Sequence, residues 1–287
     1  MTDLLCMLNH HYPMRFDNIE FAREGGSKSY LAFAGKQKYF LRSVKPAFME
    51  AAIRGVDVQL FLQEQGFPVP KIVLTNDGAA YTQDDGLFIL YEYIVGIEAD
   101  PMRDGQAVGA LVGQLHQFMQ KYPGQLIQRD RQYYIGNYVN ILRERNYPEA
   151  EEFAAHGDAL WQRVKDLPRG YCHGDLYRGN VLKTPEGKFY LLDFDTSCEG
   201  FPLYDAALFC NMTDYFKFKR GDFSKTRKAF EKFMPGYADF NVLFDLIAVY
   251  HFALQATIME LFGPGCVDHH FFDKQLDWLA RWSNECK

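Results

Sequence analysis

Three short side chains that carry oxygen lie close together in the sequence. Asp175 follows the run Tyr-Cys-His-Gly, Asn180 comes five residues later, and Asp193 follows an apolar run that ends at Leu192. Carboxylate and amide oxygens are the hard ligands that Mg²⁺ prefers. A loop carboxylate, an amide five residues on and a second carboxylate after an apolar strand indicate phosphoryl transfer from a magnesium-bound nucleotide.

Two short apolar runs position these polar groups. Residues 181–182 and 189–192 flank a turn at 185–187, a pattern that predicts a small β-hairpin. Asn180 and Asp193 then stand at the two ends of this hairpin.

The N-terminal third reads as an antiparallel sheet with one helix. Short runs rich in β-branched and aromatic residues are separated by turn signals at Gly25-Gly26 and Gly35-Lys36, which predicts a three-stranded meander. Apolar residues every four positions predict a helix over 48–65, and Gly66 ends it. Two further strands, over 72–74 and 87–93, complete five strands.

After Gly96 the strand pattern nearly stops. Apolar residues at i, i+3, i+4 and i+7 predict a helix over 108–119, further helices follow over 133–145 and 149–166, and the chain is helical from Tyr204 onward. The sequence therefore predicts an α+β fold of two lobes, with the boundary where the type of secondary structure changes. We place an N-lobe that binds nucleotide at residues 1–95. A C-lobe with the catalytic loop and the acceptor site follows at 96–287.

The central stretch resembles the aminoglycoside phosphotransferase and choline kinase superfamily of small-molecule kinases. The pattern of that superfamily is His-Gly-Asp, four residues, Asn, and then Asp-Phe-Asp, and this chain has His173-Gly174-Asp175, Asn180 and Asp193-Phe194-Asp195 in that order. Both halves of the motif occur at a short spacing, which makes the resemblance specific. It implies a protein-kinase-like two-lobed fold, with a five-stranded antiparallel N-lobe sheet, one helix and a mostly helical C-lobe.

The resemblance implies a role for each motif residue. Asp175 accepts the proton of the attacking hydroxyl, and Asn180 and Asp193 are the metal ligands that hold Mg²⁺ against ATP. Structural roles, as scaffold and brace of the catalytic loop, go to His173 and Asp205. Three further residues are candidates for contact with substrate or phosphate: Asp195, Arg178 and Tyr204. For Asp195, a role as a second metal ligand is the alternative. For Arg178, a solvent-facing position is an equal alternative.

The resemblance also implies a set of nucleotide-binding residues in the N-lobe. Two glycines between the first two strands let backbone N–H groups approach an anion. The segment near Tyr91 resembles the hinge whose backbone binds adenine. The candidates are Gly25, Gly26, Ser27, Arg42, Asp57, Glu92 and Ile94.

One of these positions departs from the family pattern. Arg42 stands where the family places a lysine that clamps the phosphates, and Arg can also pair with phosphate. Lys45 is the alternative, but its odd separation from Arg42 puts it on the other face of a strand. Glu50 and Asp57 are the candidate carboxylates to hold the cation, and we expect Asp57, the shorter one, to pair with the longer Arg42.

Composition limits the partners. The 287 residues carry a net charge of −6 with a pI near 5.8, which argues against nucleic acid as the main partner. Six scattered cysteines without a Cys-x-x-Cys pair indicate free thiols and a cytoplasmic location, and no signal peptide is visible. Residues 246–259 are apolar but too short to cross a membrane, so we expect a buried helix and no membrane partner.

The expected acceptor is a small molecule with a hydroxyl group. The C-terminal half is rich in aromatic residues, which together with acidic neighbours suit an amine. Candidate acidic partners are Asp195, Asp214, Asp245 and Glu260. The modest acidity favours an amino alcohol such as choline, ethanolamine or homoserine over an aminoglycoside or a sugar. We expect His116, on the apolar stripe of its helix, to be a core residue.

Two other classes of function are open at this stage. A kinase-like protein that binds nucleotide or a partner without turnover is one alternative, because Arg42 replaces the usual lysine. An iron oxygenase that uses His173, Asp175 and His251 is the other, but it requires a β-rich scaffold around a helical His251. The sequence does not determine the acceptor or the oligomeric state.

Overall fold

The computed structural model describes residues 2–83, 86–213 and 223–285. The chain divides into two compact units: residues 1–98 together with 180–196, and residues 99–179 together with 197–287. The sequence-based boundary near residue 95 differs in one respect, because the hairpin after Asn180 belongs to the first unit. Its strand β9 (Val181–Lys183) pairs with β6 (Ile97–Glu98) and with β10 (Phe189–Leu191), which ties the hairpin there.

The first unit contains the predicted five-stranded antiparallel sheet, in the order β1-β2-β3-β5-β4. Its strands are β1 (Asn18–Glu24), β2 (Ser27–Ala34), β3 (Gln37–Val44), β4 (Thr82–Gln83) and β5 (Leu87–Glu92). The strand predicted over 72–74 is wrong. Ile72 forms only an isolated bridge to Tyr91, with one backbone hydrogen bond on either side of it, each 2.9 Å long. The pairing stops there because Pro70 has no N–H and the Thr75 N–H turns back to the Ala79 carbonyl, and 82–83 supply the fifth strand instead.

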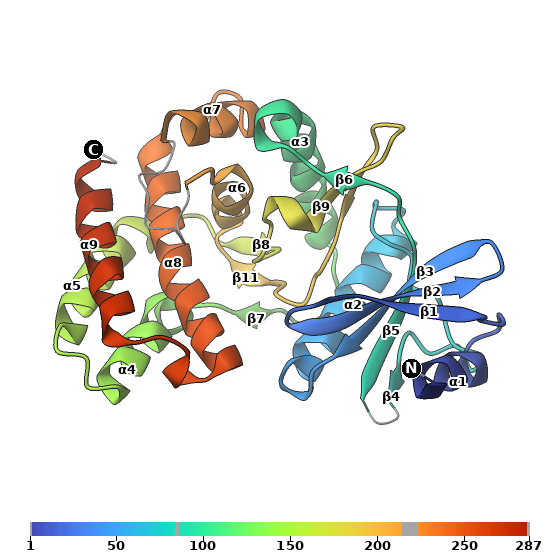
Figure 1. The fold of residues 1–287 in the computed structure, drawn as a ribbon. Helices are drawn as coiled ribbons and strands as arrows, with labels where there is room; N and C mark the ends of the chain where they lie inside the picture. Colours follow the sequence, from blue (N-terminus) through green and yellow to red (C-terminus); the bar gives the residue numbers. More distant parts are fainter. Residues whose placement is uncertain (1, 84–85, 214–222, 286–287) are drawn as a thin grey trace. The chain divides into compact units, whose positions relative to one another are not determined.

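One helix covers each face of this sheet (Figure 1). Leu8 of α1 (Thr2–His11) and Tyr12, which directly follows this helix, pack in one apolar cluster with Leu41 and Leu90. The helix predicted over 48–65 is α2 (Met49–Glu64), which packs in a second cluster with strand residues of the opposite parity, among them Val44 and Ile89. Arg42 has the parity of Val44, so its side chain lies on the face that α2 covers.

The second unit is mostly helical. Its helices are α3 (Pro101–Met119), α4 (Asn137–Glu144), α5 (Ala150–Val164), α6 (Pro202–Cys210), α7 (Phe223–Phe233), α8 (Phe240–Phe262) and α9 (His269–Glu285). A small sheet in the order β7-β11-β8 joins β7 (Ile127–Gln128), β11 (Cys198–Gly200) and β8 (Gly170–Cys172). Between β7 and α4, residues Gln132–Gly136 form a short π-helix.

Helix α8 is the core of this unit. It is long and apolar enough to cross a membrane by length and composition, but 72% of its apolar window is buried inside the protein. It packs against α4, α5 and α6. The prediction of a buried helix over 246–259 is therefore confirmed.

Candidate active site

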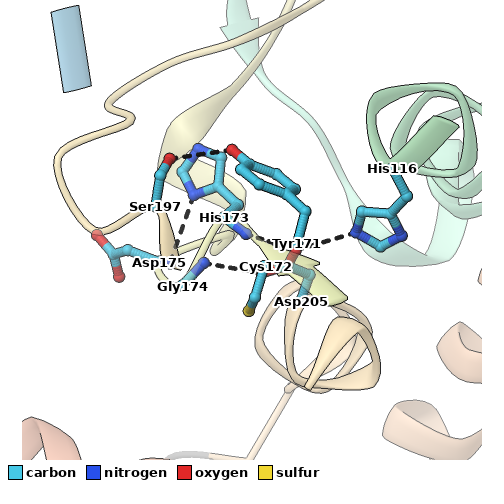
Figure 2. A network of polar contacts seen from close by, with 8 residues as sticks. All are labelled: His116, Tyr171, Cys172, His173, Gly174, Asp175, Ser197 and Asp205. Carbon is cyan, nitrogen blue, oxygen red and sulfur yellow. Dashed lines mark hydrogen bonds and ion pairs between the residues drawn. The ribbon is translucent and has the colours of Figure 1, made fainter. Parts of the chain in front are cut away.

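The predicted catalytic loop begins where β8 ends, and Asp205 holds it in place. The Asp205 carboxylate, fully buried in the first turn of α6, accepts hydrogen bonds from the backbone N–H of His173 at 2.8 Å and of Gly174 at 3.0 Å. Figure 2 shows both N–H groups directed at this carboxylate. The backbone just before Asp175 is thereby fixed from a helix, as the family resemblance implies.

Two further side chains complete this brace. Cys172 donates its thiol to Asp205 Oδ1 at 3.2 Å, and His116 Nε2 lies 3.3 Å from Oδ2 (Figure 2). Burial raises the pKa of Asp205, but hydrogen bonding and charge from His116, together with the loop N–H groups, lower it by more, so the net pKa is below the ordinary value. Asp205 is therefore an ionised acceptor at neutral pH.

His116 is a residue whose role the sequence reasoning missed. It lies on α3, where the apolar stripe predicted a core position, yet its side chain is one quarter exposed and pairs with Asp205. The stripe itself gives no sign of this partner, because Asp205 is 89 residues away in the sequence.

Asp175 is partly exposed, and its carboxylate points away from the Asp205 brace (Figure 2). Its own N–H donates to Nδ1 of the buried His173 at 3.4 Å. An accepting Nδ1 places the ring proton of neutral His173 on Nε2. Gly174 makes the turn possible, because its φ of 82° lies in the left-handed region that favours glycine.

Asn180 and Asp193 lie together in the first unit. The Asn180 carbonyl accepts the N–H of Leu192 at 2.9 Å, which places Asn180 beside the residue that precedes Asp193. Asn180 is buried, whereas the Asp193 side chain is 43% exposed and its φ of 60° is left-handed. Asp tolerates this region better than most residues, but it is a strained conformation that clusters at ligand sites.

These two oxygen donors fit a magnesium ion by their chemistry. Among the described residues there is no group of three His, Cys, Asp or Glu side chains that could hold a metal alone. Mg²⁺ in nucleotide sites uses one or two protein carboxylates and completes its octahedron with phosphates and water. One amide and one carboxylate are therefore a sufficient donor set for an ion that arrives with a nucleotide.

Arg42 is tied to the Asp193-Phe194-Asp195 segment. Its guanidinium donates to Asp195 Oδ1 at 2.9 Å and to Oδ2 at 2.5 Å, and Nε donates to Ser27 Oγ at 2.9 Å. Asp193 Oδ1 lies 3.5 Å from Nη1. The bidentate geometry makes the Arg42–Asp195 pair the strongest polar contact of this segment.

The electrostatics of this pair follow from burial and from one another's charge. Burial lowers the pKa of Arg42, but the carboxylates of Asp193 and Asp195 together raise it by more. For Asp195, burial and the like charge of Asp193 raise the pKa above its ordinary value, against the opposing effect of Arg42. Two carboxylates beside one guanidinium leave an excess of negative charge, which a divalent cation would offset.

The predicted ion pair between Arg42 and Asp57 is wrong. Asp57 is exposed on α2, and the carboxylate that holds Arg42 comes from Asp195 instead. The other helical candidate, Glu50, pairs with Arg54 at 3.7 Å on the helix surface. Lys45, the alternative clamp, pairs with Glu24 at 3.4 Å.

Gly55 explains why Asp195 can take this place. A Cβ at Gly55 would lie 2.8 Å from both the backbone N and Oδ1 of Asp195. Only glycine therefore lets α2 approach the Asp195 backbone so closely. The sequence gives no direct signal for this contact, since a glycine inside a helix is ordinarily only a weak position.

The remaining nucleotide candidates belong to the first unit. Gly25 and Gly26 form the exposed turn between β1 and β2, where no atom would obstruct a Cβ, and Ser27 begins β2. The N–H of Glu92 donates to the Lys71 carbonyl at 2.9 Å. Glu92 and Ile94 border a hollow of about 650 Å³ in the first unit.

Two of the predicted substrate contacts, Arg178 and Tyr204, differ in their exposure to solvent. Arg178 is exposed, in a short 3₁₀ turn before Asn180. Tyr204 is buried, with ring centroids 5.4 Å from Tyr134 and 5.9 Å from Tyr250, so it is a packing residue rather than an exposed contact.

The acidic residues considered for an amine are mostly neutralised. Asp195 pairs with Arg42, and Asp245 accepts two hydrogen bonds from Arg163 at 2.8 and 2.9 Å. Burial raises the pKa of Glu260. Asp214 lies outside the described residues.

Comparison with known proteins decides the family. A model of the phosphotransferase enzyme family matches residues 18–238, which is most of the chain. The chain belongs to the phosphotransferase enzyme family. This membership confirms the resemblance drawn from the His-Gly-Asp and Asp-Phe-Asp motifs.

One curated relative of this chain is a homoserine kinase of Pseudomonas aeruginosa. It is 31% identical over 167 residues, which cover 53% of this chain and 52% of the relative. The match therefore spans only about half the length of that curated relative.

Solved structures confirm the protein-kinase-like fold of this phosphotransferase family member. An amicoumacin kinase, in complex with AMP-PNP and Ca²⁺, superposes with a TM-score of 0.70 at 18% identity over 99% of this chain and 92% of the other. A choline kinase from Streptococcus pneumoniae gives a TM-score of 0.70 at 16% identity over 99% and 98%. At such identities the likeness concerns the fold.

Proposed function

We propose that this chain transfers the γ-phosphoryl group of ATP to a hydroxyl group of a small molecule. The observation that carries the proposal is the position of Asp175. It directly follows a backbone that the buried Asp205 holds through the N–H groups of His173 and Gly174. A base on a rigid loop suits phosphoryl transfer, because positioning contributes more to this reaction than proton abstraction does.

The reaction is a single displacement at phosphorus. The acceptor oxygen forms a bond to the γ-phosphorus while the bond from that phosphorus to the bridging β–γ oxygen breaks, and ADP leaves with the electron pair. The acceptor proton passes to the Asp175 carboxylate. Asn180 and Asp193 would hold a Mg²⁺ ion, which neutralises phosphate charge when bound.

Arg42 is the proposed phosphate clamp. Its guanidinium lies on the α2 face of β3, and Ser27, from the strand that follows the glycine turn, accepts from its Nε. The exposed turn at Gly25 and Gly26 lies on the same hairpin. The Gly25 N–H already donates to the Ser27 carbonyl at 3.0 Å, so Gly26 is the glycine proposed to approach a phosphate. The backbone at Glu92 and Ile94 is the proposed adenine contact, and Asp57 keeps only a surface position.

We propose a small amino alcohol as the acceptor. The curated relative is named homoserine kinase, and one fold neighbour is named choline kinase, so both compounds belong in the test panel. The acidic composition, with a net charge of −6, disfavours nucleic acid. The described cysteines are free thiols, three of them buried, and fit a reducing cytoplasm.

A second candidate is a kinase-like protein that binds nucleotide without turnover. The observation in its favour is that Arg42 already donates to Asp195 and Ser27, so a phosphate must share or displace these partners. This alternative differs from the main proposal in one measurable respect, the release of ADP in the presence of an acceptor.

The test is ADP release across a panel of homoserine, choline, ethanolamine, methylthioribose and an aminoglycoside. We expect turnover of at least one acceptor, and a loss of about 10²–10⁴-fold in Asp175→Asn. Asp166→Asn, an exposed position in the same unit, is the matched control and should keep full activity. Binding of AMP-PNP with no turnover of any acceptor would favour the second candidate.

A further inference from the structure

Arg129 is held at the end of β7 by its backbone, while its side chain lacks a charged partner. Its N–H donates to the Glu199 carbonyl at 3.0 Å, and its carbonyl accepts from Arg169 Nη2 at 2.7 Å. Its Nη1 atom is buried and donates no hydrogen bond. Within residues 2–83, 86–213 and 223–285, no carboxylate forms an ion pair with it.

The Arg129 side chain is partly buried, and a guanidinium with an enclosed nitrogen that donates no hydrogen bond is unusual. Buried charges in proteins are paired, because an uncompensated charge loses its hydration without a return. Arg42, whose side chain is also mostly buried, follows the rule and pairs with Asp195. Arg129 instead stacks on the ring of Tyr133, with Cζ 3.9 Å from the ring centroid. This contact orients the guanidinium but leaves Nη1 without an acceptor.

A second orphan donor lies in the same part of the unit. The Tyr134 hydroxyl is buried without a hydrogen-bond partner, and a Cβ at Gly200 would lie 2.5 Å from it. Tyr133 and Tyr134, with ring centroids 5.2 Å apart, both belong to the π-helix Gln132–Gly136. Such π-helical turns occur frequently at functional sites.

This region lies within the electrostatic reach of Asp175. Burial raises the pKa of Tyr133 to about 12, Arg129 opposes that shift, and Asp175 adds to it. Asp175 likewise adds to the rise that burial gives the pKa of Tyr250. The charges of Arg129 and Asp175 therefore both affect the pKa of Tyr133. All of these residues belong to the second unit.

We propose that Arg129 binds a carboxylate of the acceptor, so that the acceptor is a hydroxy amino acid rather than an uncharged or purely cationic alcohol. This inference rests on the proposed phosphotransferase function. A carboxylate matches the planar fork of the guanidinium and supplies the acceptor that Nη1 lacks. It also balances the charge of a partly buried guanidinium that forms no ion pair within the described residues.

The test compares two acceptors that differ only in the carboxylate. L-homoserine and 3-aminopropan-1-ol carry the same amine and hydroxyl groups, and only the first has the carboxylate. In Arg129→Met we expect kcat/KM for L-homoserine to fall by roughly 30- to 1,000-fold, chiefly through KM, as for loss of one partner of a buried charge pair. For 3-aminopropan-1-ol the change should stay within about threefold, which also shows that the variant is folded.

Two matched variants complete the set. Arg129→Lys keeps the charge without the fork and should lie between wild type and Arg129→Met for L-homoserine. Arg131→Met removes an arginine two positions away that pairs with Asp158 at the surface, and it should change neither acceptor.

Calorimetry separates this inference from the proposed function. L-homoserine should bind Asp175→Asn in the presence of AMP-PNP but should not bind Arg129→Met. Three results would each overturn the role of Arg129. In Arg129→Met, kcat/KM could fall equally for both acceptors, or it could stay unchanged for L-homoserine. The wild-type protein could also prefer 3-aminopropan-1-ol to L-homoserine. Unchanged turnover in Asp175→Asn would instead overturn the catalytic proposal, while a loss confined to L-homoserine in Arg129→Met would still support the carboxylate contact.

Discussion

Arg42 and Asp195 form a bidentate ion pair, with guanidinium–carboxylate distances of 2.9 and 2.5 Å. The pair joins strand β3 to the residue two positions after Asp193, the proposed metal ligand. It replaces the cation–carboxylate pair that the sequence placed between β3 and helix α2. The proposed phosphate clamp and the proposed metal segment are therefore coupled directly, without a carboxylate from the helix.

The contact between Gly55 and Asp195 predicts an unusual effect of a helix-favouring substitution. Gly55→Ala should destabilise the protein by about 1–3 kcal/mol, because the new Cβ would overlap the Asp195 backbone. Gly113→Ala is the matched control: this helical glycine has no atom within 4 Å of a Cβ, so alanine should stabilise by about 0.5–1 kcal/mol. Urea unfolding measures both, and a stabilising Gly55→Ala would disprove the tight contact.

Arg42 and Lys45 are the two candidates for the cation that binds the nucleotide phosphates, and their substitutions should affect nucleotide affinity differently. Arg42→Met should weaken binding of AMP-PNP by about tenfold or more, as expected for the loss of charge-assisted hydrogen bonds. Lys45→Met removes only a largely exposed pair with Glu24, so affinity should change by less than about threefold. Fluorescence titration measures both affinities, and the reverse order of effects would assign the clamp to Lys45.

The Asp205 brace predicts a loss of stability and of activity together. Asp205→Asn removes the negative charge of a buried carboxylate. Because that carboxylate has four hydrogen-bonding partners, the substitution should lower the free energy of unfolding by about 3 kcal/mol. The partners are the N–H groups of His173 and Gly174, the Cys172 thiol and His116. The folded-state pKa of Asp205 is below its ordinary value, so its contribution is present above the unfolded pKa and is lost as the pH falls through the folded pKa.

His116→Ala separates the contribution of the histidine to the Asp205 brace from that of the backbone hydrogen bonds. It removes one contact of Asp205 but leaves both loop N–H hydrogen bonds, so stability should fall by less than in Asp205→Asn. A loss in His116→Ala as large as in Asp205→Asn would mean that the histidine, rather than the backbone contact, is what Asp205 supplies.

His251 predicts a dependence of stability on pH. Burial in α8 lowers its pKa to about 3. Below the unfolded pKa of about 6.5 the unfolded chain binds a proton that the folded chain does not, so stability falls as the pH drops from about 6.5 toward 3. Between pH 7 and pH 5 the loss from this group should be about 2 kcal/mol.

Unfolding of His251→Phe in urea at the two pH values measures this contribution. Phenylalanine keeps the ring stacked on Trp278, whose centroid lies 4.8 Å from that of His251, and should remove most of the acid loss. His270 is exposed, so His270→Gln is the control and should show the same loss of stability in acid as wild type. An acid loss in His251→Phe equal to that of wild type would exclude His251 as its source.

The fold was largely predictable because its signals are local. Turn glycines and alternating residues placed the first three strands, and apolar residues four positions apart placed α2. The i, i+3, i+4 pattern found α3 only from residue 108, although the helix begins at Pro101. The strand at 72–74 failed because its pairing with β5 stops after one bridge, where the Thr75 N–H turns back to the Ala79 carbonyl. The apolar run at 72–74 is typical of a strand and does not reveal how early this turn begins.

The site was predictable in its motif residues and less so in their partners. Asp175, Asn180, Asp193 and Asp205 stand in one recognisable pattern. The contacts between Arg42 and Asp195, and between His116 and Asp205, join residues 153 and 89 positions apart. Partner choice across such distances depends on tertiary packing, here on the absence of a side chain at Gly55.

The most direct measurement of the central claim is a single turnover of phosphoryl transfer, followed by ³¹P NMR or rapid quench with an accepted substrate. The account predicts that Asp175→Asn binds AMP-PNP within about threefold of wild type, yet forms the phosphorylated product at least about 10²-fold more slowly. Product formation at the wild-type rate in Asp175→Asn would contradict the assignment of Asp175 as the base, and with it the account of the site.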